Sequence, residues 1–192
     1  MLKQVEKILK ESLSVKNEIL EDSKIKNMII ESVNVILKAL KRGNKIYFCG
    51  NGGSAADAQH LAAEFTGRFY LDRKALPAEA LHCNTSYITA VANDYSYEDI
   101  FSRLIDGISN PGDVLIGLST SGNSKNIIKA LKTAKLNKLH TISFTGSSEG
   151  LIKTYSDYLI SIPSKNTPRI QECHILIGHI ICQIVEEQLF KL

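Results

Sequence analysis

A histidine and a glutamate stand four residues apart in the stretch 54–68, which we predict to be a helix. This spacing places His60 and Glu64 on one face of that helix. An imidazole and a carboxylate in this arrangement can share a metal ion or a proton. Exposed helices also carry such pairs without any function, so the pair by itself does not establish a site.

A second candidate histidine lies in the C-terminal segment RIQECHILIGHI, residues 169–180. His179 is surrounded there by apolar residues. A buried imidazole needs a hydrogen-bonding partner, so His179 is either a satisfied core residue or a site group, and the apolar run alone favours the core. His174 and Glu172 of the same segment are further candidates.

The segment GNGGSA, residues 50–55, follows a predicted strand and opens the helix 54–68. Its glycines let a ligand approach the backbone, and a helix N-terminus offers free N–H groups to an anion. The segment also fits the dinucleotide pattern GxGxxA, but that pattern wants an acidic residue at the end of the second strand. The second strand ends near His82, and Asp72 precedes it. A plain tight turn is the other alternative.

A second polar turn, STSGNS at residues 119–124, joins another predicted strand to a helix. Hydroxyl groups and N-terminal amides together can hold a phosphate without a lysine. The turn is not a P-loop, because no Gly-Lys-Ser/Thr follows it. Ser124 could merely cap the helix. A cap needs one such residue, however, so four hydroxyl side chains favour phosphate binding.

These polar turns alternate with apolar segments that predict the fold. Residues 1 to about 42 are expected to form two amphipathic helices, ended by Gly43. Short apolar, β-prone runs follow at 45–49, 78–82, 114–119, 140–144 and 158–162. Helices are predicted at 54–68, 97–108, 124–136, near 148–154 and at 168–189. This alternation predicts an α/β three-layer sandwich with a five-stranded parallel, flavodoxin-like sheet and a ligand crevice at the carboxyl ends of the strands.

The composition suits one domain of ordinary size, with 192 residues of which 44% are hydrophobic and 22% charged. The net charge of +3 comes from scattered lysines and arginines, so we expect no nucleic-acid partner. The four cysteines form no CxxC pair and are expected to be buried reduced thiols. The N-terminal residues lack the apolar core of a signal peptide and no stretch is apolar enough to span a membrane, so we predict a cytoplasmic protein.

The motifs together resemble the phosphoheptose isomerases of the SIS (sugar isomerase) family. The resemblance is carried by CGNGGS, HLAAEFTGR, NDYSYEDIFSR, GDVLIGLSTSGNS and RIQECHILIGHI, in this order along nearly the whole chain. It implies a single SIS domain over residues 1–192, with a helical extension at 1–43 and an α/β core at 44–192. It also implies a homotetramer with active sites at subunit interfaces.

The activity that the resemblance implies is the isomerisation of sedoheptulose 7-phosphate to D-glycero-D-manno-heptose 7-phosphate. This is the first step of nucleotide-activated heptose synthesis for lipopolysaccharide or capsule. Glu64 would be the catalytic base and His179 would handle the second proton. The implied zinc ligands are His60, Glu64, Gln171 and His179. The implied substrate-binding residues are Asn51, Gly52, Gly53, Ser54, Asn93, Asp94, Ser119, Thr120, Ser121, Ser124 and Gln171.

Two positions fit the resemblance less well. Ideal helical spacing aligns Glu172 with His179 better than Gln171, although the family pattern selects Gln171. Pro168 stands where some relatives carry a polar residue. Two other functions remain open at this point. One is a non-catalytic SIS scaffold, such as a replication-initiator-associating protein, and the other is a sugar-phosphate sensor.

Overall fold

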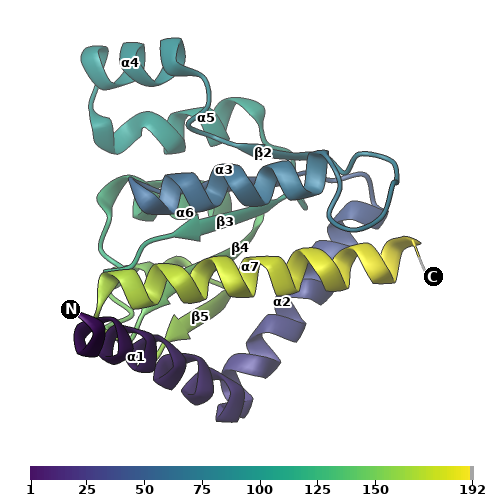
Figure 1. Cartoon of the computed structure of the whole chain (residues 1–192). Coiled ribbons are helices and arrows are strands. Elements are labelled where there is room, and N and C mark those ends of the chain that lie inside the picture. Colours follow the sequence, from purple (N-terminus) through teal and green to yellow (C-terminus); the bar gives the residue numbers. More distant parts are fainter. Residues whose placement is uncertain (191–192) are drawn as a thin grey trace.

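The computed structural model describes residues 1–190 and forms a parallel sheet covered by helices on both faces (Figure 1). The sheet has five strands in the order β2-β1-β3-β4-β5, all parallel, which confirms the predicted flavodoxin-like order. The strands are β1 (Ile46–Cys49), β2 (Ala78–Ala80), β3 (Val114–Leu118), β4 (His140–Gly146) and β5 (Tyr158–Ile162).

The helices form two layers. They are α1 (Leu2–Glu21), α2 (Ser23–Lys41), α3 (Gly53–Thr66), α4 (Thr85–Asp94), α5 (Ile100–Ile108), α6 (Lys125–Leu136) and α7 (Thr167–Phe190), with 3-10 turns η1 (Tyr97–Asp99) and η2 (Leu151–Tyr155). The first core cluster joins α2, α3 and α7 to one face of the sheet through residues such as Phe48, Ile116 and Phe144. The second joins α5 and α6 to the other face through Tyr47 and Leu115.

Local sequence explains where the N-terminal helices begin and end. The Asp22 carboxylate accepts hydrogen bonds from the backbone N–H groups of Lys24 and Ile25, which caps α2. Gly43, with φ of +81°, follows the end of α2 as predicted. Helix α2 then packs against β5 and α7.

Sequence analysis missed helix α4 and merged η1 with α5. The Asn84 side chain caps α4 by accepting from the N–H of Tyr87. The residues Tyr87, Ile88 and Val91 give it an apolar stripe at helical spacing that packs on the second core cluster. The stripe is short, and Thr85, Ser86 and Thr89 of the same segment have low helix propensity, so tertiary packing decides the conformation here.

Most of the cysteine prediction is confirmed. Within the described residues the four cysteines are free thiols, and Cys49, Cys173 and Cys182 are buried. The prediction was wrong for Cys83, which is exposed because it lies in the turn after β2. None of the helices within residues 1–190 is long and apolar enough to cross a bilayer.

Candidate active site

The carboxyl end of β1 leads directly into α3 through a turn that only glycine can make. A Cβ atom at Gly50 would lie 2.3 Å from the carbonyl oxygen of Ser54, and Gly52 has a φ of +55°. The turn therefore brings the first N–H groups of α3 to the carboxyl edge of the sheet, where Ser54 is buried. This is the position at which α/β proteins of this topology bind ligands.

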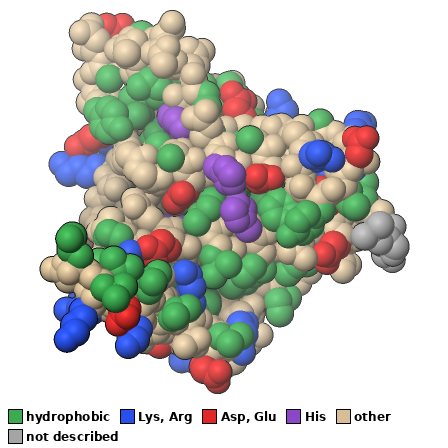
Figure 2. All heavy atoms as spheres, in the orientation of Figure 1, with side chains coloured by type: hydrophobic (Ala, Val, Ile, Leu, Met, Phe, Trp, Pro, Cys, Tyr) green, Lys and Arg blue, Asp and Glu red, His purple; other side chains and the backbone are tan. Residues whose placement is uncertain are grey.

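His60, Glu64 and His179 converge between α3 and α7. The Nε2 atom of His60 lies 3.2 Å from Oε1 of Glu64 and 2.9 Å from Nε2 of His179. Figure 2 shows histidine side chains adjoining each other at the surface between these helices. The His60 side chain is 49% exposed and that of Glu64 is 22% exposed, so the group is open to a ligand. His60 is thus joined to a residue that lies 119 positions away.

The cluster fits a divalent metal ion on the chemistry of its atoms. One atom from each of His60, Glu64 and His179 lies within 4.8 Å of the others. A tetrahedral zinc with ligand bonds of about 2.1 Å holds its ligand atoms roughly 3.4 Å apart. The two Nε2 atoms also face each other, which requires a shared proton or a common cation. Two imidazoles and a carboxylate suit zinc better than calcium or magnesium.

The structure separates Gln171 from Glu172. A Cβ atom at Gly53 would lie 2.5 Å from Nε2 of Gln171, so the Gln171 amide rests against the first turn of α3. Glu172 lies on the α1 side instead, where it accepts hydrogen bonds from Ser12 and Arg169. Gln171 is therefore the neighbour of the glycine-rich turn, although α7 presents both residues.

Of the two histidines of α7, the core residue is His174 and not His179. His174 is fully buried and its Nε2 atom lies 3.3 Å from the carbonyl oxygen of Thr145. Its Nδ1 atom has no hydrogen-bond partner among residues 1–190. Burial, partly offset by the hydrogen bond to Thr145, lowers the pKa of His174 to about 4.

The buried imidazole predicts acid sensitivity of the fold. An unfolded chain takes up a proton at His174 near pH 6.5, whereas the folded protein does so only near pH 4. The unfolded state therefore binds more protons in this window, and the free energy of unfolding falls as the pH drops through it. We expect a loss of about 2 kcal/mol from this group between pH 7 and pH 5. Urea unfolding at both pH values should show a smaller loss for His174→Leu, and an unchanged pH dependence would contradict the assignment.

The serine turn joins β3 to α6 and leaves its hydroxyl groups together. Ser119 is buried and its hydroxyl donates to Oγ of Ser124 at 2.9 Å. Ser124 occupies the N-cap position of α6, yet within the described chain its side chain makes no capping hydrogen bond. The capping interpretation of Ser124 thus fails. Beside it, Thr120 is partly exposed and Ser121 is exposed.

The glycine-rich turn and the serine turn are linked by an amide pair that sequence analysis missed. The side chains of Asn51 and Asn126 exchange two hydrogen bonds of 2.8 Å. The hydroxyl of Tyr97 donates to Oδ1 of Asn51 at 3.0 Å. Asn126 lies in the first turn of α6 and Tyr97 in η1, and the sequence signals available for them were the STSGNS and NDYSYED segments. Asn51 consequently holds three motifs together.

Asn93 and Asp94 lie at the exposed end of α4 and not in the histidine cluster. The Asn93 amide donates to Oδ1 of Asp94 at 2.9 Å, and neither side chain bonds to the cluster in the described residues.

Asp57 stands one turn before His60 on α3 and is therefore a closer candidate. Sequence analysis did not single it out. Burial raises the pKa of Asp57, with an opposing effect of His60. Its Oδ2 atom is buried and unpaired within residues 1–190.

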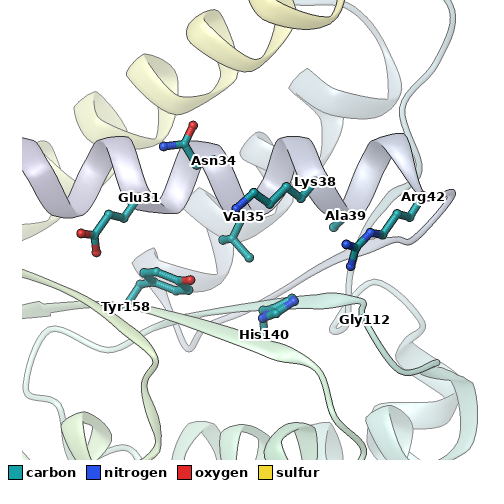
Figure 3. Close-up of a pocket in the computed structure, with 9 residues that line it drawn as sticks. All are labelled: Glu31, Asn34, Val35, Lys38, Ala39, Arg42, Gly112, His140 and Tyr158. Atoms are coloured by element: carbon teal, nitrogen blue, oxygen red, sulfur yellow. The ribbon is translucent and has the colours of Figure 1, made fainter.

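A separate hollow of about 360 Å³ lies at the opposite end of the sheet, between α2 and the first residues of β4 and β5 (Figure 3). His140, Tyr158, Lys38 and Arg42 line it. None of the residues that line it belongs to the predicted site.

Comparisons with known proteins agree with this geometry. The SIS domain family model matches residues 8–146. The phosphoheptose isomerase of Clostridium acetobutylicum is 52% identical over 97% of this chain and 95% of its own. That of Aquifex aeolicus is 49% identical over 97% of both chains. The solved phosphoheptose isomerase of Neisseria gonorrhoeae is 39% identical with a TM-score of 0.91, over 97% of this chain and 98% of its own. The one from Francisella tularensis is 32% identical with a TM-score of 0.93 over the same shares.

A parallel sheet with a hydroxyl-rich turn at its carboxyl edge and a polar cluster between two of the covering helices is the framework of a sugar-phosphate isomerase domain, and this chain is such an enzyme. Within that class, the chain belongs to the phosphoheptose isomerases of the SIS family. The resemblance read from the sequence motifs is thereby confirmed.

Proposed function

We propose that this chain converts sedoheptulose 7-phosphate to D-glycero-D-manno-heptose 7-phosphate, with the His60–Glu64–His179 cluster as its catalytic centre. The observation that supports this most strongly is the convergence of two imidazoles and a carboxylate between α3 and α7. The reaction would be the first step of nucleotide-activated heptose synthesis for lipopolysaccharide or capsule.

The reaction moves a carbonyl group from C2 of a ketose to C1 of an aldose. A base must remove a proton from C1, and an acid must deliver one to C2. We assign the first role to the Glu64 carboxylate, which is only partly exposed beside His60. We assign the second role to His179, whose Nε2 atom lies 2.9 Å from Nε2 of His60. Negative charge that develops on the two substrate oxygens needs stabilisation by nearby positive groups or donors.

We propose that zinc occupies the cluster, held by His60, Glu64, Gln171 and His179. When bound, the metal supplies Lewis-acid stabilisation of the negative charge on the substrate oxygens. Gln171, whose amide lies against Gly53 at the start of α3, would contribute its amide oxygen. The remaining polar residues of that turn, Asn51 and Ser54, would face the sugar hydroxyls.

The phosphate group would bind at the serine turn. Ser119, Thr120, Ser121 and Ser124 supply hydroxyl groups, and the N-terminus of α6 supplies N–H groups and a favourable dipole. Asn93 and Asp94 would complete the sugar pocket only if α4 approaches the substrate, since they are exposed in the described chain.

Replacing the serines tests the phosphate site. We expect Ser121→Ala and Ser124→Ala each to weaken substrate binding by about 1–3 kcal/mol, the scale of a hydrogen bond to a charged group. Ser156→Ala is the matched control. Ser156 lies just before β5, away from the serine turn, and its hydroxyl donates to that of Ser143 in β4. Inorganic phosphate should compete with the substrate. Absence of inhibition at high phosphate would place the phosphate site elsewhere.

We further propose a cytoplasmic homotetramer with active sites at subunit interfaces. Helix α1 supports this assembly, because it exposes a stripe of apolar side chains that a monomer would leave in water. Leu2, Val5, Ile8, Leu9 and Leu13 are each at least 50% exposed. Sedimentation of the purified protein measures the assembly, and a monomer at micromolar concentration would contradict it.

Incubating the purified protein with sedoheptulose 7-phosphate tests the proposed activity. We expect an aldose heptose phosphate to accumulate until equilibrium. Binding without any product would instead indicate a sensor, and neither binding nor product would indicate a scaffold.

A further inference from the structure

A buried ion pair joins the segment after α3 to α7. The Nε atom of Arg73 donates to Oε2 of Glu186 at 2.8 Å. The Arg73 side chain is 3% exposed and that of Glu186 is 2% exposed. Buried charges are costly unless every polar atom finds a partner, so the other contacts of this pair decide what it does.

Glu186 holds the loop that follows α3. Its carboxylate accepts hydrogen bonds from three consecutive backbone N–H groups, those of Phe69 at 3.1 Å, Tyr70 at 2.7 Å and Leu71 at 2.9 Å. Burial alone would raise the pKa of Glu186, but these N–H groups and Arg73 hold it below its usual range. The carboxylate is therefore charged and fixes the loop against α7.

Arg73 closes the C-terminal end of α3. The last carbonyl groups of a helix have no partner within the helix. Arg73 donates from Nη2 to the carbonyl oxygen of Glu64 at 2.8 Å, and from Nη1 to that of Phe65 at 2.7 Å and that of Gly67 at 3.2 Å. Its positive charge also suits the negative end of the helix dipole. The Arg73 guanidinium thus binds the backbone carbonyl of Glu64, whose side chain is the proposed base.

The same pair reaches His179 from α7. Glu186 lies seven residues after His179, which is nearly two helical turns and places both on one face of α7. Phe69, which Glu186 holds by its N–H, has its ring centroid 5.7 Å from that of the His179 ring. The Phe69 ring packs in turn on Tyr70 at 4.5 Å. One carboxylate therefore fixes the ring that covers one side of His179.

We propose that Arg73 and Glu186 are positioning residues that set the approach of Glu64 to His179 by clamping α3 to α7. They act through the helices and the loop, and touch neither substrate nor metal. This inference rests on the proposed function for its effect on catalysis, whereas its structural effect on the two histidines does not.

Substitution of the clamp should disturb the cluster at a distance. In Glu186→Gln the charge that holds three N–H groups and Arg73 is lost. We expect kcat to fall about ten- to hundredfold with a smaller change in KM, as is usual for residues that orient metal or catalytic ligands. Arg73→Lys keeps the charge but cannot reach the carbonyl oxygens of Glu64 and Phe65 together with Glu186, so it should give an effect of the same kind.

Asp113→Asn is the matched control. Asp113 is likewise buried, and its carboxylate accepts hydrogen bonds from the N–H groups of Lys45 and Asn110 and from the Asn44 amide, at the amino end of the sheet. Its loss should lower the free energy of unfolding without altering kcat. All variants are compared at a temperature where urea titration shows them to be folded.

The decisive readout is the ¹⁵N spectrum of the imidazole rings, which needs neither substrate nor metal. We expect the Nε2 signals of His60 and His179 to shift in Glu186→Gln and in Arg73→Lys, and to stay in place in Asp113→Asn. Unchanged signals in both clamp variants, with kcat as in the wild type, would overturn the proposal. A wild-type protein without turnover would defeat the proposed function alone, because the spectrum still tests the clamp.

Discussion

Replacing Glu64 by glutamine is expected to lower kcat by roughly a hundredfold or more, the scale of losing a general base. Glutamine has nearly the shape of glutamate, and it can still lie beside His60, 3.2 Å away in the native protein. It cannot accept the proton from the sugar carbon. Binding of the heptose phosphate should therefore stay nearly intact while turnover falls, as steady-state kinetics and equilibrium binding would show.

Glu187→Gln serves as the control for this substitution. Glu187 is an exposed carboxylate of α7 that accepts a hydrogen bond from Gln183, so its loss should leave kcat unchanged. Normal turnover in Glu64→Gln would remove Glu64 from the role of base.

The second large effect is expected from the double variant His60→Ala, His179→Ala. It removes both imidazoles of the cluster and should bind no zinc and show no measurable turnover. The fold should survive, because His60 is exposed and the two core clusters consist of other residues. Elemental analysis of protein purified without a histidine tag measures the metal, and circular dichroism verifies the fold.

Chelation provides the complementary measurement on the native protein. A chelator should reduce activity, and zinc should restore it more fully than magnesium, since imidazole ligands favour zinc. A protein that is metal-free, fully active and indifferent to chelators would contradict the metal site. Glu64 and His179 would then act as a plain acid–base pair.

The sheet could be predicted from the sequence because its strands are short, β-prone apolar runs separated by helical patterns. Strands buried on both faces need little more than this signal, as the fully buried β3 illustrates. Helix α4 could not be predicted with the same ease. Its stripe of Tyr87, Ile88 and Val91 is short, and contact with the second core cluster stabilises it.

The site was harder to predict because helix α7 presents polar residues on several faces. An apolar run contains both His174 and His179, and only the packing of α7 on the sheet shows which of them is buried. Gln171 and Glu172 are adjacent in sequence, but Gln171 contacts Gly53 whereas Glu172 accepts a hydrogen bond from Ser12. Only these contacts show which of the two lies beside the glycine-rich turn. Such distinctions depend on contacts between residues far apart in the chain.

The Arg73–Glu186 clamp illustrates the same limit. Its two residues are 113 positions apart, and neither belongs to a motif with a recognisable spacing. Only the structure shows that the end of α3 and the loop after it are held by α7. The residues that we propose to carry the chemistry were predicted from the sequence, whereas those that we propose to orient them were not.

Isomerisation in heavy water tests the central claim most directly. Sedoheptulose 7-phosphate is incubated with the purified enzyme in D₂O until equilibrium, and the heptose phosphates are examined by mass spectrometry and proton NMR. Proton transfer through Glu64 and His179 predicts D-glycero-D-manno-heptose 7-phosphate that carries deuterium from the solvent at C2, with Glu64→Gln forming little of it. Failure of the wild-type enzyme to form the aldose, or formation of an aldose free of deuterium, would contradict the account.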